Sequence, residues 1–202
     1  MIAASKILSL DEIAIVTTRL ESKWQKSKNA RMNLAIFRLA CLGLRCMEIQ
    51  LLQMRDIHLA TTLPEIQLRT GCTKGGKPRV VSLSWDKTGL ECLKRWEAIR
   101  DASGALATDP VICRQAARSR PGRMCTTEIA KRFKTAVRCL GAGRVRQLHI
   151  HCGRHSFVSH LMVAGAEMPV IRDAAGHASI SVQNDYCHPT GRAAAVALYD
   201  DV

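Results

Sequence analysis

The chain has 202 residues, enough for one sizeable domain with a core of its own. Thirty lysines and arginines against 17 aspartates and glutamates give a formal net charge of +13. This surplus favours a polyanionic partner such as DNA, RNA or an anionic membrane surface, because basic side chains that neutralise phosphates release counterions. The apolar runs are shorter than the roughly 18 residues that a membrane-spanning helix needs, so we expect no such helix.

Nine cysteines raise the question of disulfides or zinc. Their number is odd, none of the pairs has the spacing of a metal knuckle, and the N-terminus lacks the pattern of a secretory signal. We therefore expect reduced, mostly structural thiols in a cytoplasmic protein, and we predict neither a metal site nor a cofactor.

The N-terminal third reads as helical. Ser9-Leu-Asp-Glu12 is a capping-box pattern that begins a first helix, with apolar residues at helical spacing as far as Trp24. A second helix is expected over 30–42, ending near Gly43, and a short third helix over 46–53.

Two strands are predicted next, over 65–69 and 79–83. Gly75-Gly76 between them supplies the positive φ that a hairpin turn needs. The pattern returns to helix over 86–100, and 101–122 is expected to be loop.

Thr126 or Thr127 is expected to cap a helix that runs to Leu140 and is stopped by the glycines of 141–143. Further helices are expected over 154–164 and 169–175, and in the Ala-rich tail. The predicted fold class is α+β, mainly α, with a small antiparallel β-sheet. We expect residues 1–202 to form a single domain.

Positive charge is concentrated in one stretch. Residues 112–146 carry ten basic residues and one acid, so they hold +9 of the net +13. Such a run is often only a solvated face, and by itself it identifies no ligand.

Several polar residues are suited to phosphate chemistry. His151 and Arg154 lie three residues apart near a predicted helix start, where backbone N–H groups also attract anions. Arg45 enters another helix among apolar neighbours, and Glu48 three residues later could hold its guanidinium. Lys74 lies at the hairpin tip. Each feature alone has an ordinary structural explanation.

Taken in order, these residues resemble the tyrosine recombinase (phage integrase) family. Gly43-Leu-Arg45-Cys-Met-Glu48-Ile is similar to the family's first arginine box, and His151-Cys-Gly-Arg154-His-Ser-Phe to its second. The hairpin 73–83 resembles the family's lysine-bearing β-turn. Gly176-His177 and Tyr186 follow at the family's interval. Gly153 departs from the usual Leu, and we expect it to loosen the start of its helix.

The resemblance implies a chemistry. Tyr186 would attack a DNA phosphodiester and form a 3′-phosphotyrosine, so that rejoining needs no ATP. His151 would accept the phenol proton, Arg45 and Arg154 would bind the phosphate oxygens, and Glu48 would support Arg45. Lys74, or less readily Lys77, would protonate the leaving 5′-oxygen, and His177 would donate a hydrogen bond to the phosphate.

The resemblance also implies partners. The predicted fold is the family's catalytic domain without the N-terminal clamp domain, a size similar to the fimbrial phase-switch recombinases. Double-stranded DNA is the expected partner, bound by a homotetramer whose subunits are monomers in solution, near the nucleoid and with no membrane involved. The candidate DNA-binding residues are Lys77, Arg79, Lys131, Lys134 and Arg138. Two alternatives stay open: a non-catalytic DNA-binding regulator of the same fold, and a type IB topoisomerase-like nicking-closing enzyme.

Overall fold

A computed structural model describes residues 3–73, 76–114 and 122–176 of the chain. Eight α-helices lie in these ranges: α1 (Leu10–Glu21), α2 (Lys28–Cys41), α3 (Cys46–Leu51), α4 (Lys87–Ala102), α5 (Thr126–Ala136), α6 (Ala142–Gln147), α7 (Ile150–Val163) and α8 (Met168–Ala175). The strands are β1 (Ile57–His58), β2 (Glu65–Leu68) and β3 (Arg79–Ser82). This mainly helical composition with a small sheet confirms the predicted fold class. No helix among the described residues is both long and apolar enough to span a membrane.

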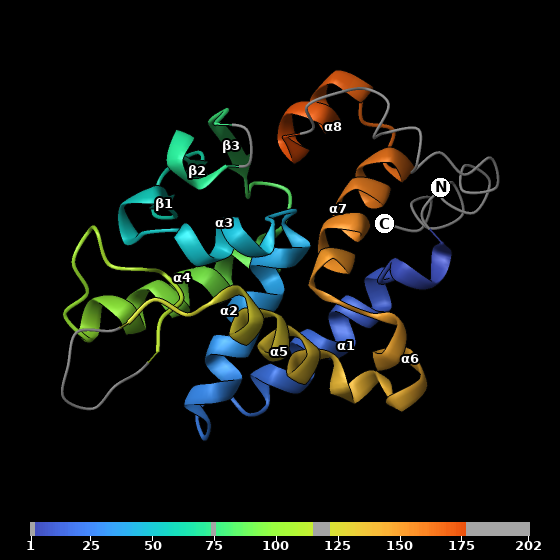
Figure 1. Cartoon of the computed structure of the whole chain (residues 1–202), viewed down its shortest axis with the longest axis horizontal. Helices are drawn as coiled ribbons and strands as arrows, with labels where there is room; N and C mark the ends of the chain where they lie inside the picture. Colours follow the sequence, from blue (N-terminus) through green and yellow to red (C-terminus); the bar gives the residue numbers. More distant parts are fainter. Residues whose placement is uncertain (1–2, 74–75, 115–121, 177–202) are drawn as a thin grey trace.

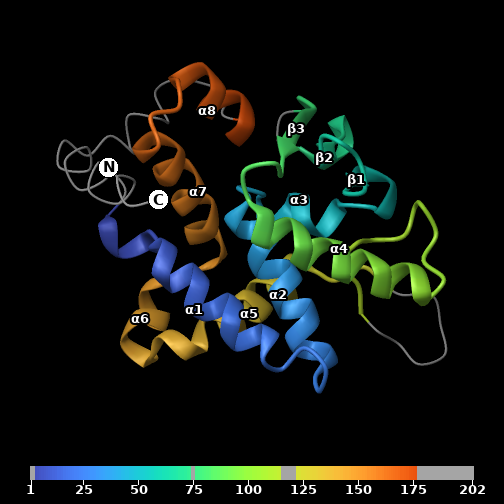
Figure 2. The ribbon, with the colours of Figure 1, turned by 180° about the vertical axis from the view of Figure 1, so that it is seen from behind.

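Helix α2 is the centre of the molecule. It packs against α1, α4, α5 and α7, and Figures 1 and 2 show it between them from opposite sides. Its apolar side chains are buried around most of the helix, so it has no solvated face along its second half. Arg38, on this helix, is buried in an ion pair with Asp86, the cap residue of α4.

Helix α1 begins as predicted. The Ser9 hydroxyl accepts a hydrogen bond from the Glu12 amide at 3.1 Å, and the Glu12 carboxylate accepts one from the Ser9 amide at 3.0 Å. Arg144 of α6 holds the same carboxylate with its Nε and Nη2 atoms. This clasp, the ion pair of Glu12 and Arg144, connects the N-terminal segment to α6. The sequence did not predict this helix, because the glycines of 141–143 indicated only that the preceding helix ends.

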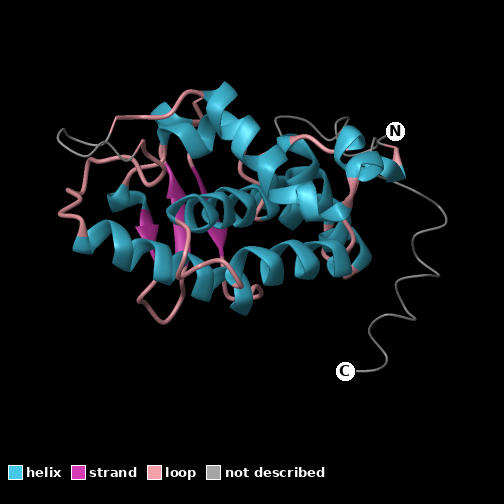
Figure 3. Ribbon diagram, turned by 90° about the horizontal axis from the view of Figure 1, so that it is seen from below, coloured by secondary structure: helices cyan, strands magenta, loops and turns pink. Residues whose placement is uncertain are grey.

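The sheet is antiparallel in the order β1-β2-β3, with Ile66 opposite both Ile57 and Val81. Ile66 and Val81 are buried and join the common core, so the sheet covers one flank of the helices. Figure 3 shows the three strands grouped in one half of the molecule. β2 and β3 lie where the sequence predicted strands, whereas β1 is too short to leave a clear pattern.

Two glycines permit close packing around α7. Gly43 follows α2 with φ +86°, and a Cβ atom there would lie 2.5 Å from the Phe157 ring. Gly153 lies against Ala40 of α2, so that a Cβ atom would lie 2.8 Å from the Ala40 carbonyl carbon. The helices α2 and α7 can approach this closely only because Gly153 has no side chain. This contact is a structural reason for the departure from leucine at this position.

Candidate active site

Four elements converge on one edge of the molecule: the start of α3, the start of β3, the first half of α7 and the end of α8. In Figure 1 they meet in the upper part of the view, where α8 lies beside β3 and above α7. Each element contributes a polar side chain or a backbone carbonyl group to the same cluster.

Arg45 is the cap residue of α3. Its backbone N–H donates to Oε2 of Glu48 at 2.7 Å, and its Nη1 donates to Oε1 of Glu48 at 3.0 Å. Its Nη2 donates to the Gly176 carbonyl at 2.9 Å, and 23% of the side chain is exposed. The guanidinium is therefore held from two sides while part of it still reaches solvent.

Glu48 is the buried anion of the cluster, with 1% of its side chain exposed. Burial alone would raise its pKa, but the hydrogen bonds and charges of Arg79 and Arg45 outweigh burial and hold the pKa below 4.5. The carboxylate is consequently ionised at neutral pH and balances two cations. Glu48 therefore joins Arg45 and Arg79 through one carboxylate.

Arg79 differs from its predicted setting as a DNA-contacting surface residue. Its Nη1 and Nη2 donate to the two Glu48 oxygens at 2.6 and 2.8 Å, and its Nε donates to the Ala174 carbonyl at 3.1 Å. Only 6% of the side chain is exposed. Its position at the start of a hairpin strand suggested exposure, and only the packing of α8 against β3 buries it.

Arg154 lies within α7 and is 4% exposed. Its Nη1 donates to the Gly43 carbonyl at 2.6 Å, and its Nη2 donates to the Ala175 carbonyl. Arg79, Arg154 and Arg45 thus bind three successive carbonyl groups at the C-terminal end of α8, on residues 174–176. α8 ends there, and carbonyl groups in the last turn of a helix have no partner within the helix itself.

α7 begins at Ile150, four residues before the predicted start at residue 154, so His151 lies in its first turn. The His151 side chain is exposed. Its pKa is lowered from 6.5, first by partial burial of the ring and then by the charges of Arg154 and Arg45. His149 and His155 lie beside it, and partial burial with the neighbouring positive groups lowers the pKa of His155 to about 4. Neutral imidazoles therefore predominate here at neutral pH, which suits His151 to accept a proton.

Three of the predicted site residues, Lys74, His177 and Tyr186, lie outside the described residues. The structure describes the chain directly beside two of them, Lys74 and His177. β3 follows the hairpin that carries Lys74, and Gly176 ends α8 in the left-handed conformation, with φ +63°, directly before His177. Among the described residues no group of three or more potential ligands could hold a metal ion.

The predicted DNA-binding lysines and arginines fall into two groups. Lys77, Lys131 and Arg138 are exposed and can reach phosphates of a duplex without any rearrangement. Lys134 instead donates to the Val145 carbonyl of α6 and is only partly exposed.

A groove of about 600 Å³ runs beside α5. It is lined by Lys28, Asn29, Met32, Arg114, Met124, Glu128, Lys131, Arg132 and Thr135. Lys28 belongs to α2, far from the basic run in the sequence, so no local pattern could have linked it to this surface. The start of α5 adjoins the start of α3, where the Cys46 thiol lies 3.3 Å from the Thr126 carbonyl. α5, which borders the basic groove, therefore also lies beside the helix that Arg45 caps.

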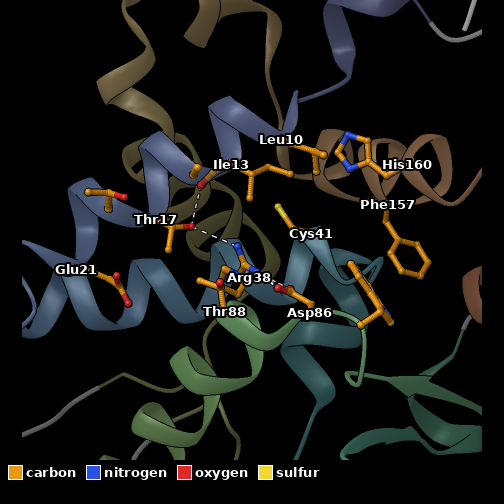
Figure 4. A pocket seen from close by; sticks show the side chains of 13 residues that line it. Leu10, Ile13, Thr17, Glu21, Arg38, Cys41, Asp86, Thr88, Phe157 and His160 are labelled. Atoms are coloured by element: carbon orange, nitrogen blue, oxygen red, sulfur yellow. Dashed lines mark hydrogen bonds and ion pairs between the residues drawn. The ribbon is translucent and has the colours of Figure 1, made fainter. Parts of the chain in front are cut away.

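A second hollow, of about 380 Å³, lies between α1, α2, α7 and the start of α4. Figure 4 shows Arg38 and Asp86 at its base, with Thr17 bonded to Arg38, and Leu10, Ile13 and Phe157 on its walls. None of the residues of the arginine cluster lines it.

The sequence and the fold are similar to those of known proteins. The model of the phage integrase family matches residues 7–192. Tyrosine recombinase XerC of Pseudomonas entomophila is 32% identical over 72% of this chain and 44% of its own length. Tyrosine recombinase XerD of Rickettsia bellii is 29% identical over 91% of this chain and 59% of its own length. The chain thus spans about half the length of these relatives.

Solved structures agree on the fold. The XerH site-specific recombinase bound to difH substrate in a pre-cleavage complex superposes with a TM-score of 0.70 and 21% identity, covering 97% of this chain and 55% of that one. The XerA recombinase gives a TM-score of 0.68 with 19% identity, covering 96% and 62%. With a family model matched over almost its whole length, the chain belongs to the phage integrase family of tyrosine recombinases.

Proposed function

We propose that this chain cuts and rejoins double-stranded DNA at specific sites through a 3′-phosphotyrosine intermediate on Tyr186. The observation that carries the proposal is the convergence of Arg45 and Arg154. These guanidinium groups come from different helices, yet they bind the neighbouring carbonyl oxygens of Gly176 and Ala175, immediately before His177. Two cations fixed side by side match the oxygens of one phosphate.

The proposed cleavage step is an in-line displacement. The Tyr186 oxygen bonds to phosphorus as the bond from phosphorus to the 5′-oxygen breaks, which leaves a 3′-phosphotyrosine and a free 5′-hydroxyl. The phenol proton passes to neutral His151, and Lys74, or Lys77 as the less favoured donor, protonates the leaving oxygen. Rejoining reverses these transfers with another 5′-hydroxyl as nucleophile.

Arg45 and Arg154 would stabilise the negative charge that builds on the phosphate oxygens, with His177 donating a further hydrogen bond. Their present carbonyl partners are neutral, so a phosphate dianion-like transition state would compete well for the same N–H groups. Glu48 would keep Arg45 in place throughout. The scheme needs neither a metal ion nor a cofactor.

The basic groove beside α5 would hold the duplex chiefly through phosphates. Lys131 and Lys28 lie exposed on its walls, and Lys77 and Arg138 are further exposed candidates. From the family resemblance, we also propose that the working form is a homotetramer on DNA, formed from subunits that are monomeric in solution, in the cytoplasm near the nucleoid.

A covalent-trapping assay tests the proposal. A library of randomised, nicked duplexes traps the intermediate, because the short fragment beyond the cleaved bond diffuses away and prevents rejoining. We expect a protein–DNA adduct that survives denaturation and is absent for Tyr186→Phe. DNA binding without any adduct would instead support a non-catalytic regulator, and relaxation of supercoiled plasmid without recombinant products would support a nicking-closing enzyme.

A further inference from the structure

We infer that Arg79 is a positioning residue for strand cleavage. Its side chain couples the start of β3 to Arg45 and Arg154, the two arginines proposed to bind phosphate, and to the end of α8. The inference rests on the proposed function for its consequence in catalysis. Its structural part, that Arg79 fixes the end of α8 and the start of α3, can be tested without any DNA substrate.

The contacts of Arg79 join three elements. The residue begins β3, two of its nitrogens bind Glu48 on α3, and its Nε binds the Ala174 carbonyl on α8. The two bonds to Glu48 are parallel, so the planar guanidinium fixes the carboxylate in orientation as well as in position. Glu48 in turn orients Arg45 through the bond at 3.0 Å.

Arg79 also determines where the chain leaves α8. A Cβ atom on Gly176 would lie 2.8 Å from Cδ of Arg79 and 3.1 Å from its Nη1, so the turn that leads into His177 is packed directly on this side chain. Removing the guanidinium would have two effects. The Ala174 carbonyl would lose its hydrogen bond from Nε, and an empty space would form next to Gly176. The carbonyl partners of Arg154 and Arg45 on residues 175–176 would then lose a fixed position.

The geometry argues against a direct phosphate contact by Arg79. Arg154 is similarly buried, but it donates to the neutral carbonyl groups of Gly43 and Ala175. Arg79 instead donates two of its nitrogens to the Glu48 carboxylate. A side chain that bound DNA phosphate from this position would have to abandon the buried Glu48 carboxylate, at a cost in stability. Its influence on the reacting phosphate must therefore pass through Glu48, Arg45 and α8.

Arg69 provides a matched control. It follows β2 and also holds a buried carboxylate, that of Asp56, with two bonds, from its Nε at 2.6 Å and its Nη2 at 3.0 Å. This ion pair joins the end of β2 to the short 3-10 turn at Met54–Asp56, rather than to α3 or α8. Arg79→Met removes the arginine partner of the Glu48 carboxylate, and Arg69→Met removes that of the Asp56 carboxylate. Both carboxylates are buried, so both variants should lose stability. Only Arg79→Met should disturb the site.

The first measurement compares single-turnover cleavage at saturating nicked duplex with DNA affinity. We expect Arg79→Met to cleave about 100-fold more slowly, the loss typical of a misplacement near 1 Å, with DNA affinity and its salt dependence retained. Arg69→Met should cleave at nearly the wild-type rate. Arg79→Lys, which keeps a cation beside Glu48 but has no fork, should fold readily and restore part of the rate.

Unchanged cleavage in both Arg79 variants would overturn the inference. So would a loss of DNA affinity with a salt slope reduced by about one, because that pattern identifies a phosphate contact.

Hydrogen exchange gives a second measurement that needs no substrate. Amides of 168–176 and 46–49 should exchange faster in Arg79→Met and Arg79→Lys than in Arg69→Met. If the wild-type chain forms no adduct, the proposed function fails, and this comparison still decides whether Arg79 holds the two elements. Equal exchange in all variants would refute the coupling.

Discussion

Replacement of Gly153 by alanine tests the packing that places the site helix. At an exposed helical position this change stabilises a protein by about 1 kcal/mol, because alanine favours the helix more than glycine does. Here the new Cβ would lie 2.8 Å from the Ala40 carbonyl carbon and 2.9 Å from its Cβ and carbonyl oxygen. Two of these atoms are backbone, within a buried helix, and they cannot move aside as a side-chain end could.

Overpacking of this kind costs about 1–3 kcal/mol, so it should outweigh the gain in helix propensity. We expect Gly153→Ala to lower the free energy of unfolding by up to about 2 kcal/mol, which corresponds to a fall in Tm of up to about 8 °C for a domain of this size. Arg154 is the next residue on α7, so a shift of this helix would move its guanidinium. We therefore expect the variant to cleave DNA more slowly as well.

The assay is urea and thermal unfolding beside a control, Gly143→Ala in α6. A Cβ atom on Gly143 would meet no other part of the described chain within 4 Å, so this variant should be as stable as the wild type or slightly more stable. A gain in stability for Gly153→Ala equal to that of the control would refute the proposed overpacking.

Three further predictions concern charge. Glu48→Gln leaves two cations around a neutral buried group, so the free energy of unfolding measured in urea should fall by about 3–5 kcal/mol, and unchanged stability would contradict a stabilising role for this ion pair. The Glu12 carboxyl, whose pKa the bond to Arg144 lowers from 4.5, contributes stability that is complete above pH 4.5 and lost as the pH falls through its folded-state pKa. Stability measured across this range should therefore depend less on pH in Glu12→Gln than in the wild type, and parallel curves would count against the clasp. Lys131→Ala should weaken DNA binding and reduce the salt slope by about one, whereas Lys134→Ala, which removes a bond to Val145, should leave the slope unchanged; titration at several salt concentrations separates them.

The pH dependence of cleavage tests the proposed role of His151 as proton acceptor. Its pKa lies below 6.5, so the neutral ring that accepts a proton persists at mildly acidic pH. The single-turnover rate should fall on the acidic side only below pH 6.5. A decline that begins well above this value would indicate a different proton acceptor.

Local patterns predicted much of this structure. The capping box of Ser9 and Glu12 specifies the start of α1 because both partners lie within one turn. Arg45 and Glu48 are likewise neighbours in sequence, so their pairing could be anticipated. Arg154 and its partner Gly43 are 111 positions apart. Only the resemblance to a family, and no local pattern, suggested that Arg154 and the Arg45 segment lie together.

The remaining features depend on tertiary contacts. Arg79 occupies a strand position that would suit a surface cation, and it is buried only because α8 packs against β3. Lys28 joins the basic groove because α2 lies beside α5. The short α6 follows Gly141, whose φ of +86° ends the preceding turn, and a glycine at such a point predicts an end without predicting a new helix. Gly153 reads as a weak point in a helix until its contact with Ala40 is known.

The covalent link between Tyr186 and DNA, on which the proposed function depends, can be identified chemically. Adduct trapped on a nicked duplex is digested with nuclease and protease, and the nucleotide-bearing peptide is identified by mass spectrometry. We predict a peptide containing Tyr186 joined through a 3′-phosphate, with a free 5′-hydroxyl on the released strand. A nucleotide on any other residue, or a link to a 5′-phosphate, would show that the proposed nucleophile or its direction of attack is wrong.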